Sequence, residues 1–373
     1  MTTPKEVYVG IDVAKLRNAV ALADAGREGE IRYMGEFDAS ADSMKKLVQR
    51  LAAKYERLHF CYEAGPTGYG LHRLITDLGH DCMVIAPSLI PRKPSDRIKT
   101  NRRDAISLAR LLRAGELTAV WVPDPAHEAM RNLIRSRTAA VETIRVHKQQ
   151  ISAFLLRHSR IFPRQKHWGA RYRRWLQEQS FEHPADQIVL QEYIEAVRLG
   201  EARLVRIEKV IDEFLPKWHL APVVEGLQAL RGIDLVVAVS FVVEIGDIRR
   251  FSSPSNLMGY LGLVPTERST GETVRRCSIT KMGNARIRQL LVESAWTYRF
   301  PPRVSARKKK KLDQVSPKIR EIAWKAQSRL TARYRAFVAR GKKSTVACTA
   351  VARELVGFMW AVAMEVQPSP PTT

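Results

Sequence analysis

Three acidic residues stand where regular structure is predicted to end or to begin. Asp12 closes the apolar run Val7–Ile11, and Glu63 closes a second run, Leu58–Tyr62. Both runs have the β-branched and aromatic content of buried strands, whereas Asp104 opens a helical pattern. Burying a carboxylate costs free energy unless a cation or a donor offsets that cost. Because carboxylates at the ends of neighbouring strands can meet in space, these residues could together hold Mg²⁺, which takes oxygen ligands and retains several waters.

The same acidic residues also have simpler explanations. Asp12 could cap a strand end, Glu63 could face solvent, and Asp104 could favour the dipole of its helix. We favour the metal-binding interpretation because all three residues occur in one region of alternating strand and helix patterns. An α/β region with carboxylates at neighbouring strand ends has the layout of an RNase H-like nuclease core.

Residues 1–124 are therefore predicted to form an α/β domain that ends at the prolines Pro123 and Pro125. Its strands are predicted at Val7–Ile11, Ala19–Ala23, Ile31–Phe37, Leu58–Tyr62, Cys82–Ala86 and Thr118–Val122. Its helices are predicted at 41–55, 68–79 and 104–113.

The charge of the chain indicates its partner. Its 373 residues include 62 Lys and Arg against 38 Asp and Glu, so the formal net charge is +24. A surplus of this size favours a polyanion, most simply nucleic acid, and its spread over most of the chain favours a folded protein with a long binding surface. The 4 cysteines lack the spacing of metal ligands, and we expect reduced thiols in or near the core of a cytosolic protein. No signal peptide is visible and no apolar run approaches the roughly 18 residues of a membrane span, so we expect no membrane attachment.

Two long helices are predicted in the middle of the chain, at 126–160 and 185–215. The second carries apolar residues at alternating spacings of three and four, which is the a/d seam of a coiled coil. Its members are Leu190, Tyr193, Val197, Gly200, Leu204, Ile207, Ile211 and Phe214. The seam predicts either an intramolecular hairpin with 126–160 or an intermolecular coiled coil. Between the two helices, Trp168, Tyr172 and Trp175 lie among basic residues, a pattern that suits stacking on unpaired bases.

The C-terminal region begins near Trp218 and is predicted to be mainly helical. Leu230-Arg231-Gly232-Ile233, followed by an apolar helix from Leu235 to Ile245, has the helix-hairpin-helix pattern, whose turn amides can take a DNA phosphate. Ser269-Thr270-Gly271 falls in a predicted polar loop, where a hydroxyl is either part of a turn or a nucleophile for a phosphodiester. The basic run Arg307–Lys311 is expected to be solvated and mobile, and able to track a phosphate backbone. Helices are also predicted at 285–298, 315–340 and 344–364.

Six short motifs, in this order and spacing, resemble the DEDD transposases of bacterial insertion sequences, the family named after insertion sequence one-ten. The motifs are Gly10-Ile11-Asp12-Val13-Ala14-Lys15, Tyr62-Glu63-Ala64-Gly65, Lys99-Thr100-Asn101-Arg102-Arg103-Asp104-Ala105, Leu230-Arg231-Gly232-Ile233, Leu261-Gly262-Leu263-Val264-Pro265 and Ile279-Thr280-Lys281-Met282-Gly283-Asn284. The resemblance extends from Tyr8 to about Met364. It implies a RuvC-like N-terminal domain, a helical linker that oligomerises and a C-terminal transposase domain with a serine. It also implies DNA recombination directed by a structured RNA that the element encodes.

The resemblance assigns roles residue by residue. It places the metal-binding carboxylates at Asp12, Glu63 and Asp104. The fourth acidic position of the family falls at Asn101, whose amide oxygen can still face Mg²⁺ but brings no charge. We expect the nucleophile at Ser269. Some members have serine directly before the glycine, where this chain has Thr270, but a primary hydroxyl is less hindered than that of threonine. The resemblance further implies active sites that join the carboxylates of one protomer to the serine of another.

We therefore expect a RuvC-like DEDD domain over 1–124, a helical coiled-coil linker over 125–217, a serine transposase domain over 218–366 and a disordered tail over 367–373. The expected function is Mg²⁺-dependent cleavage and exchange of DNA strands through a phosphoserine intermediate. We expect a homo-oligomer that binds donor and target DNA and a structured guide RNA, in the bacterial cytoplasm near the nucleoid. The alternatives are a metal-dependent nuclease of the Holliday-junction-resolving kind, in which water attacks, and a non-enzymatic nucleic-acid scaffold.

Overall fold

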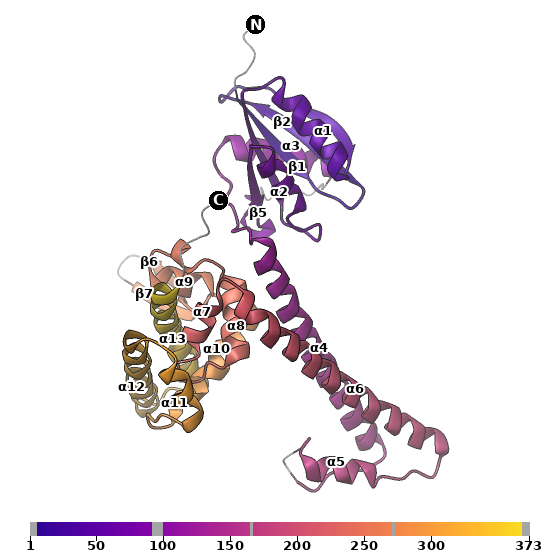
Figure 1. Cartoon of the computed structure of the whole chain (residues 1–373), viewed down its shortest axis with the longest axis vertical. Coiled ribbons are helices and arrows are strands. Elements are labelled where there is room, and N and C mark those ends of the chain that lie inside the picture. Colours follow the sequence, from indigo (N-terminus) through magenta and orange to yellow (C-terminus); the bar gives the residue numbers. More distant parts are fainter. Residues whose placement is uncertain (1–5, 92–99, 165–166, 271–272, 368–373) are drawn as a thin grey trace. The chain divides into compact units, whose positions relative to one another are not determined.

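The structure, a computed structural model of the chain, describes residues 6–91, 100–164, 167–270 and 273–367 (Figure 1). The chain separates into two compact units, Met1–Val122 and Pro123–Thr373. Each unit has its own hydrophobic clusters. The boundary falls where the sequence places two prolines close together.

The N-terminal unit is built on a five-stranded sheet with the order β3-β2-β1-β4-β5. Its strands are β1 (Glu6–Asp12), β2 (Arg17–Asp24), β3 (Ile31–Asp38), β4 (Arg57–Glu63) and β5 (Asp81–Ile85). Its helices are α1 (Ala41–Ala52), α2 (Gly70–Asp77), the short η1 (Pro87–Leu89) and α3 (Asn101–Arg113). The first three strands form an antiparallel meander, and β4 and β5 run parallel to β1. This mixed sheet with helices confirms the RNase H-like pattern that the sequence predicts.

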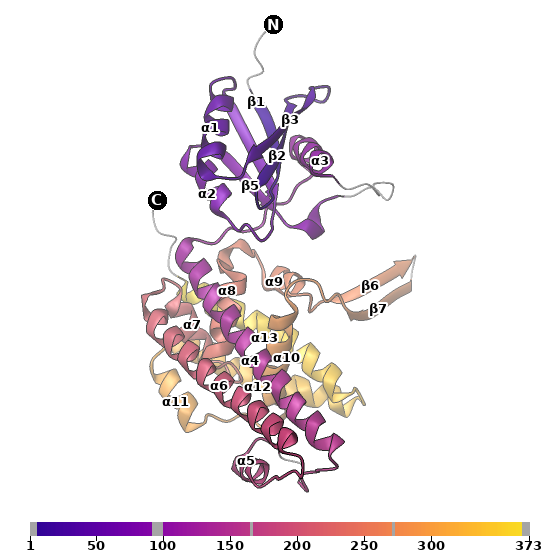
Figure 2. The same cartoon turned by 90° about the vertical axis from the view of Figure 1, so that its right-hand side faces the viewer.

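The two faces of the sheet carry different side chains because residues alternate along each strand. One face carries large apolar residues such as Val9, Ile11 and Phe60, which pack against the apolar side of α1. The other face carries small residues, among them Ala19 and Ala21, and this face receives α3. Figure 2 shows α1 and α2 on one side of the sheet and α3 on the other. Small residues on the α3 face let that helix approach the strands closely.

The strand predicted at Thr118–Val122 is wrong. The segment touches the sheet at an isolated bridge between Ala119 and Ile85, and the Val120 amide donates to the Val84 carbonyl at 2.8 Å. Pro123 follows at once, and proline has no amide hydrogen with which to extend a ladder.

The C-terminal unit begins with two long helices, α4 (Pro125–Arg157) and α6 (Pro184–Phe214), which pack along each other (Figure 1). Gly200 provides the closest approach, since a Cβ there would lie 2.8 Å from Cγ1 of Ile144. Ion pairs join the same helices, with 2.7 Å between Nη2 of Arg137 and Oε1 of Glu208. The seam of α6 therefore packs within one chain, which is the intramolecular alternative.

The aromatic segment between these helices forms α5 (Ala170–Gln177) and covers their far end. Tyr172 is only 2% exposed, and Trp168 and Trp175 pack partly buried in the same apolar cluster. Phe154 of α4 belongs to this cluster too. The predicted role of these three aromatic residues in stacking on bases needs correction, because most of their surface already stabilises the tip of the helical hairpin.

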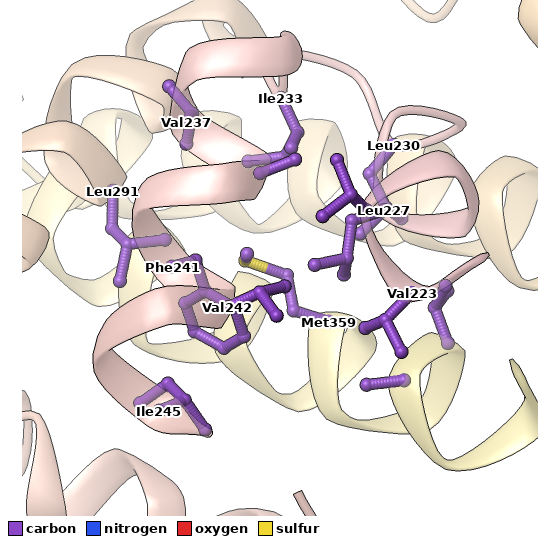
Figure 3. Close-up of a cluster of buried hydrophobic side chains, with 14 of the residues drawn as sticks. Val223, Leu227, Leu230, Ile233, Val237, Phe241, Val242, Ile245, Leu291 and Met359 are labelled. Atoms are coloured by element: carbon purple, nitrogen blue, oxygen red, sulfur yellow. The ribbon is translucent and has the colours of Figure 1, made fainter. Parts of the chain in front are cut away.

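The rest of the C-terminal unit is a helical body around one large core. Its elements are η2 (Leu215–Lys217), α7 (Ala221–Leu227), α8 (Leu235–Ile245), η3 (Ile248–Arg250), α9 (Pro254–Tyr260), β6 (Pro265–Thr270), β7 (Thr273–Ile279), α10 (Ala285–Ala295), η4 (Trp296–Arg299), α11 (Ala306–Asp313), α12 (Pro317–Ala339) and α13 (Ser344–Val366). Figure 3 shows Leu227, Val242 and Met359 meeting in this core from α7, α8 and α13. Helices α7 and α8 are joined by a tight turn at the position of the predicted helix-hairpin-helix pattern, and Gly232 in this turn has a φ of 81°. A side chain at Gly232 would meet the Ser294 carbonyl oxygen at 2.5 Å, so this turn is held tightly against α10.

Helix α13 corrects the expectation that no apolar stretch reaches the length of a membrane span. It has 23 residues and a window of mean hydropathy 1.5, so by length and composition it could cross a bilayer. Half of that window is buried inside the protein, and Val351, Leu355 and Met359 are fully buried in the core. Arg329 pairs with Glu354 of this helix. These contacts are those of a central core helix.

Three further expectations about the C-terminal region are corrected. The lysine run is helical in α11, and Nζ of Lys308 donates to the Ile233 carbonyl at 2.7 Å, so this residue is tied to the α7–α8 turn. Cys277 is exposed on β7 and is not a core thiol. Gln367, the first residue of the predicted tail, accepts a hydrogen bond from the Ile248 amide at 3.0 Å and is ordered by it. The remainder of that tail, 368–373, lies outside the described residues.

Replacing Gly10 by alanine should destabilise the N-terminal unit. An added Cβ would lie 2.4 Å from the Ala105 carbonyl oxygen and 2.4 Å from the Ala109 amide nitrogen, so α3 would have to move. We expect a loss of about 1–3 kcal/mol in the free energy of unfolding, the usual cost of overpacking. Urea unfolding measures it. Gly70→Ala is the matched control, because the space beside Gly70 is open. Equal stability of the two variants would contradict the predicted close packing.

Candidate active site

Asp12 and Glu63 lie side by side at one edge of the N-terminal sheet. The parallel register pairs Gly10 with Cys61 and Ile11 with Tyr62, so the next residues, Asp12 and Glu63, stand at the same level. Alternation along a strand puts Asp12 on the same face as Gly10, and Glu63 on the same face as Cys61. That face is the one covered by α3, since Sγ of Cys61 donates to the Leu108 carbonyl at 3.6 Å.

Asp104 is brought to the same edge by the direction of α3. The far end of this helix is fixed by Arg113, whose Nη1 donates to the carbonyls of Asp24 and Gly29 at 3.1 and 2.6 Å. Asp24 pairs with the first residues of β1, so α3 runs opposite to β1 and its N-terminus lies at the strand end that carries Asp12. Asp104 stands in the first turn of the helix, with its Oδ2 atom shielded from solvent. The three predicted acids therefore share one end of the sheet.

The start of α3 adds positive potential at this edge. The Arg103 amide donates to Oγ1 of Thr100 at 3.3 Å, which caps the helix. The unpaired amides of a helix N-terminus attract negative charge, such as a carboxylate or a phosphate. Asn101 is the first residue of α3 and is exposed, so it is reached from solvent more readily than Asp104.

The donor set at this edge fits a hard divalent cation. Carboxylate and amide oxygens are the ligands that such ions prefer, and Mg²⁺ commonly binds through few protein ligands while keeping its waters. Within the described residues, no group of three or more His, Cys, Asp or Glu side chains stands close enough to hold a metal ion by itself. Burial raises the pKa of the neighbouring Cys61 thiol, which therefore stays protonated and is a poor metal ligand. The protein residues alone supply an incomplete coordination shell at this edge.

Ser269 lies in a β-hairpin of the C-terminal unit, although the sequence predicted a polar loop. It is the fifth residue of β6 and pairs with Val274 of β7. Its side chain is exposed, and Oγ donates to Oε1 of Glu267 at 2.7 Å. Thr270 is the last residue of β6 and pairs with Thr273, so both candidate hydroxyls stand near the hairpin end. Figure 2 shows this hairpin projecting from the helical body beside α9.

Two of the glycine motifs fix the base of this hairpin. Gly262 has a φ of 64° and Gly283 a φ of 66°, which are left-handed conformations that suit glycine. A Cβ on Gly262 would lie 2.3 Å from the Met282 carbonyl oxygen, so the two chain segments touch through their backbones. Nη1 of Arg288 donates to the Leu261 and Gly283 carbonyls at 3.3 and 3.1 Å and joins the segments. The motifs therefore position the strand that carries Ser269.

Comparisons with known proteins identify the family of this chain. A family model for DEDD transposases of IS110 elements, described as "Transposase", matches residues 9–160. A second model, described as "Transposase IS116/IS110/IS902 family", matches residues 224–309. The chain is 64% identical over 361 residues to "Putative transposase y4qE" of Sinorhizobium fredii, a match that covers 97% of this chain and 89% of that protein.

The chain belongs to the IS110 family of transposases. It is also 31% identical over 302 residues to the transposase for insertion sequence element IS1533 of Leptospira borgpetersenii, covering 80% of this chain and 86% of the relative. A further relative is the transposase for insertion sequence element IS1328 of Yersinia enterocolitica, 26% identical over 303 residues and covering 79% of this chain and 84% of the relative. The protein is thus an enzyme that acts on DNA, and its DEDD domain implies a divalent metal.

The structure of this transposase also contains contacts at the candidate site that the sequence did not predict. Glu267 contacts the hydroxyl of Ser269 because they are two residues apart on one face of a strand, and the predicted loop hid that alternation. Arg288 joins two of the motifs by donating to backbone carbonyls, and the sequence contains no signal for this contact. A glycine inside a strand pattern signals close backbone approach, so Gly10 carried a usable signal.

Neutralising a carboxylate at the sheet edge should abolish DNA strand cleavage. Asp104→Asn and Asp12→Asn remove charge with little change of volume, so folding should persist and cleavage in Mg²⁺ should fall by at least about a hundredfold. A cleavage assay with a melting curve for each variant measures both effects. Asp42→Asn is the control, because Asp42 occupies the first turn of α1 as Asp104 does that of α3. If Asp42→Asn and Asp104→Asn cleave equally well, Asp104 serves only its helix dipole.

Proposed function

We propose that this transposase cuts and rejoins DNA strands through a covalent bond between Ser269 and a DNA phosphate. The carrying observation is the hydrogen bond from Oγ of Ser269 to Oε1 of Glu267, on an exposed strand. A serine hydroxyl is a weak nucleophile until an adjacent base accepts its proton, and a carboxylate at 2.7 Å is placed to do so. In the proposed step, Oγ bonds to phosphorus and its proton passes to Glu267. The bond from phosphorus to one sugar oxygen breaks, and that oxygen takes a proton from water as it leaves as a hydroxyl.

A serine phosphodiester keeps the free energy of the bond that it replaces. The released sugar hydroxyl of another strand can therefore attack the same phosphorus, restore Ser269 and join the strands without an external source of energy. Attack by water would discard that energy. This distinction separates the proposed recombinase from the nuclease of the Holliday-junction-resolving kind.

We assign the divalent metal, which we take to be Mg²⁺, to Asp12, Glu63 and Asp104, with Asn101 as a neutral oxygen donor. When bound, the metal would neutralise charge on the phosphate oxygens. The protein residues hold it from the sheet edge and the helix start, and the amides of the α3 N-terminus favour a phosphate close by. Asn101 lowers the negative charge of the set, which predicts weaker metal binding than four acids would give.

A structured guide RNA and a homo-oligomer complete the proposal. The formal charge of +24 supports binding of several nucleic acids, namely donor DNA, target DNA and RNA. The seam of α6 is occupied within the chain, so contacts between protomers need another surface. Large apolar side chains remain exposed on α6, with Ile188 at 58% and Leu199 at 54%. They lie eleven residues apart, close to three helical turns, and so share one face that a second copy could cover. The activity would take place in the bacterial cytoplasm, where the DNA is.

Ser269→Ala should bind DNA normally and form no covalent adduct. Mass spectrometry of protein trapped on a cleavable DNA duplex maps the attachment site. Thr270→Ala is the control for the neighbouring hydroxyl and should still form the adduct. A phosphopeptide at Thr270 would overturn the choice of Ser269. Strand cleavage without any adduct would favour water attack and the nuclease.

Removing RNA should stop recombination if the enzyme is guided. Protein purified after treatment with ribonuclease is assayed on donor and target DNA, with and without the RNA that co-purifies from untreated cells. We expect joined products only when that RNA is returned, and a steep loss of RNA binding as salt rises, because many phosphate contacts release counterions. Joined products from RNA-free protein would show that guidance is not required.

A further inference from the structure

A pocket of the C-terminal unit is lined by residues that include neither Ser269 nor the three predicted carboxylates. It is formed between the α7–α8 turn, the segment from η4 to α11 and one face of α12. Its volume is about 420 Å³, which falls within the range of roughly 300–1,000 Å³ usual for small-ligand sites. The lining is mainly apolar and includes Phe300, Val304 and Ala323.

The walls of this pocket are fixed by hydrogen bonds. Nη1 of Arg231 donates to the Pro301 carbonyl at 2.8 Å and to Oε1 of Gln327 at 3.1 Å. The same Oε1 atom accepts from the Arg303 amide at 2.8 Å, and Gln327 is only 6% exposed. On the opposite wall, Nζ of Lys308 donates to the Ile233 carbonyl. The shape of the pocket therefore belongs to the folded body and does not depend on loose side chains.

An exposed aromatic residue stands among cations at the mouth of this pocket. Trp324 is 53% exposed on α12, a helix that packs on α13. Arg320 is exposed one turn earlier on the same face of α12, and Arg303 is exposed on the facing segment. Among the described residues that line the pocket, four are Arg or Lys and none is acidic. Apolar walls with a cationic rim match a flat base attached to phosphates.

We propose that this pocket receives one unpaired DNA nucleotide, with its base stacked on Trp324 and its phosphates beside Arg320 and Arg303. Aromatic side chains bind bases by stacking without regard to pairing, whereas a base inside a duplex cannot reach such a surface. The inference deepens the proposed strand exchange, because exchange needs strands that are separated. The pocket proposal rests on the proposed strand exchange but not on the role of Ser269. Binding of the nucleotide can therefore be measured with the metal removed, when no cleavage occurs.

The test uses the full-length protein in EDTA with two DNA probes of the same sequence. One is a perfect duplex, and the other carries a single unpaired 2-aminopurine, whose fluorescence falls when it stacks on an aromatic ring. We expect the wild-type protein to quench the unpaired probe and to bind it more tightly than the duplex. Trp324→Ala should weaken binding of the unpaired probe by about tenfold or more and leave the duplex unchanged. Trp324→Phe should restore most of the quenching.

Charge and folding have their own controls. Arg320→Ala should weaken binding of the unpaired probe and reduce the salt dependence of that binding by the equivalent of about one phosphate contact. Lys325→Ala should change the affinities for both probes equally. Lys325 is exposed on α12 but does not line the pocket. Melting curves show whether each variant is folded.

Three results would overturn the assignment. Equal losses for duplex and unpaired probes in Trp324→Ala would mean a general DNA contact, and unchanged quenching would mean that the base does not enter. An RNA version of the unpaired probe that binds more tightly than the DNA version would transfer the pocket to RNA. If the enzyme forms the adduct but does not quench the unpaired probe, the phosphoserine proposal holds and the pocket proposal fails. If the probe is quenched but no adduct forms, the pocket proposal holds and the phosphoserine proposal fails.

Discussion

The direct contact between helix α3 and strand β1 is the constraint on which the N-terminal site depends. At Gly10 the backbones of helix and strand come so close that not even a methyl group fits. Alanines on β2 continue the smooth surface, and Arg113 fixes the far end of the helix to Asp24 and Gly29. Because the helix is held at its middle and its end, its first turn cannot drift from the strand ends. The position of Asp104 is thus set by small residues that do no chemistry.

In the C-terminal unit, too, close backbone packing positions the candidate residue. Gly262 and Gly283 allow two backbone segments to touch, and Arg288 joins them by donating to their carbonyls. The hairpin that bears Ser269 leaves the body from this junction. In both units, glycines permit the close approach and an arginine fixes it by bonding carbonyl oxygens. The residues proposed to react are carried at the ends of these fixed elements.

Much of this arrangement could be predicted from sequence, and the failures have physical causes. Five strands of the N-terminal sheet and the helix of Asp104 were predicted because buried strands and amphipathic helices leave strong periodic signals. Thr118–Val122 has the composition of a strand. Whether it forms a ladder depends on pairing with a strand distant in the sequence, and the composition of a segment does not predict that pairing. The hairpin of Ser269 was missed because the sequence of its strands is mostly polar, so no apolar alternation marked them. Lys308 was predicted to be solvated with the rest of its basic run, because the carbonyl that it contacts, at Ile233, lies far away in the sequence.

The exposed hairpin has a consequence for how this enzyme can change over evolutionary time. A two-stranded ribbon without a core of its own adds little to the stability of the protein, and the contacts described above attach this one at its base. Substitutions along β6 and β7 therefore escape the penalty that a buried residue such as Val242 or Met359 would incur. Positions of this hairpin other than Ser269 and Glu267 can therefore change with less effect on folding than positions in the core. The proposed nucleophile therefore stands on an element that contributes little to the stability of the fold.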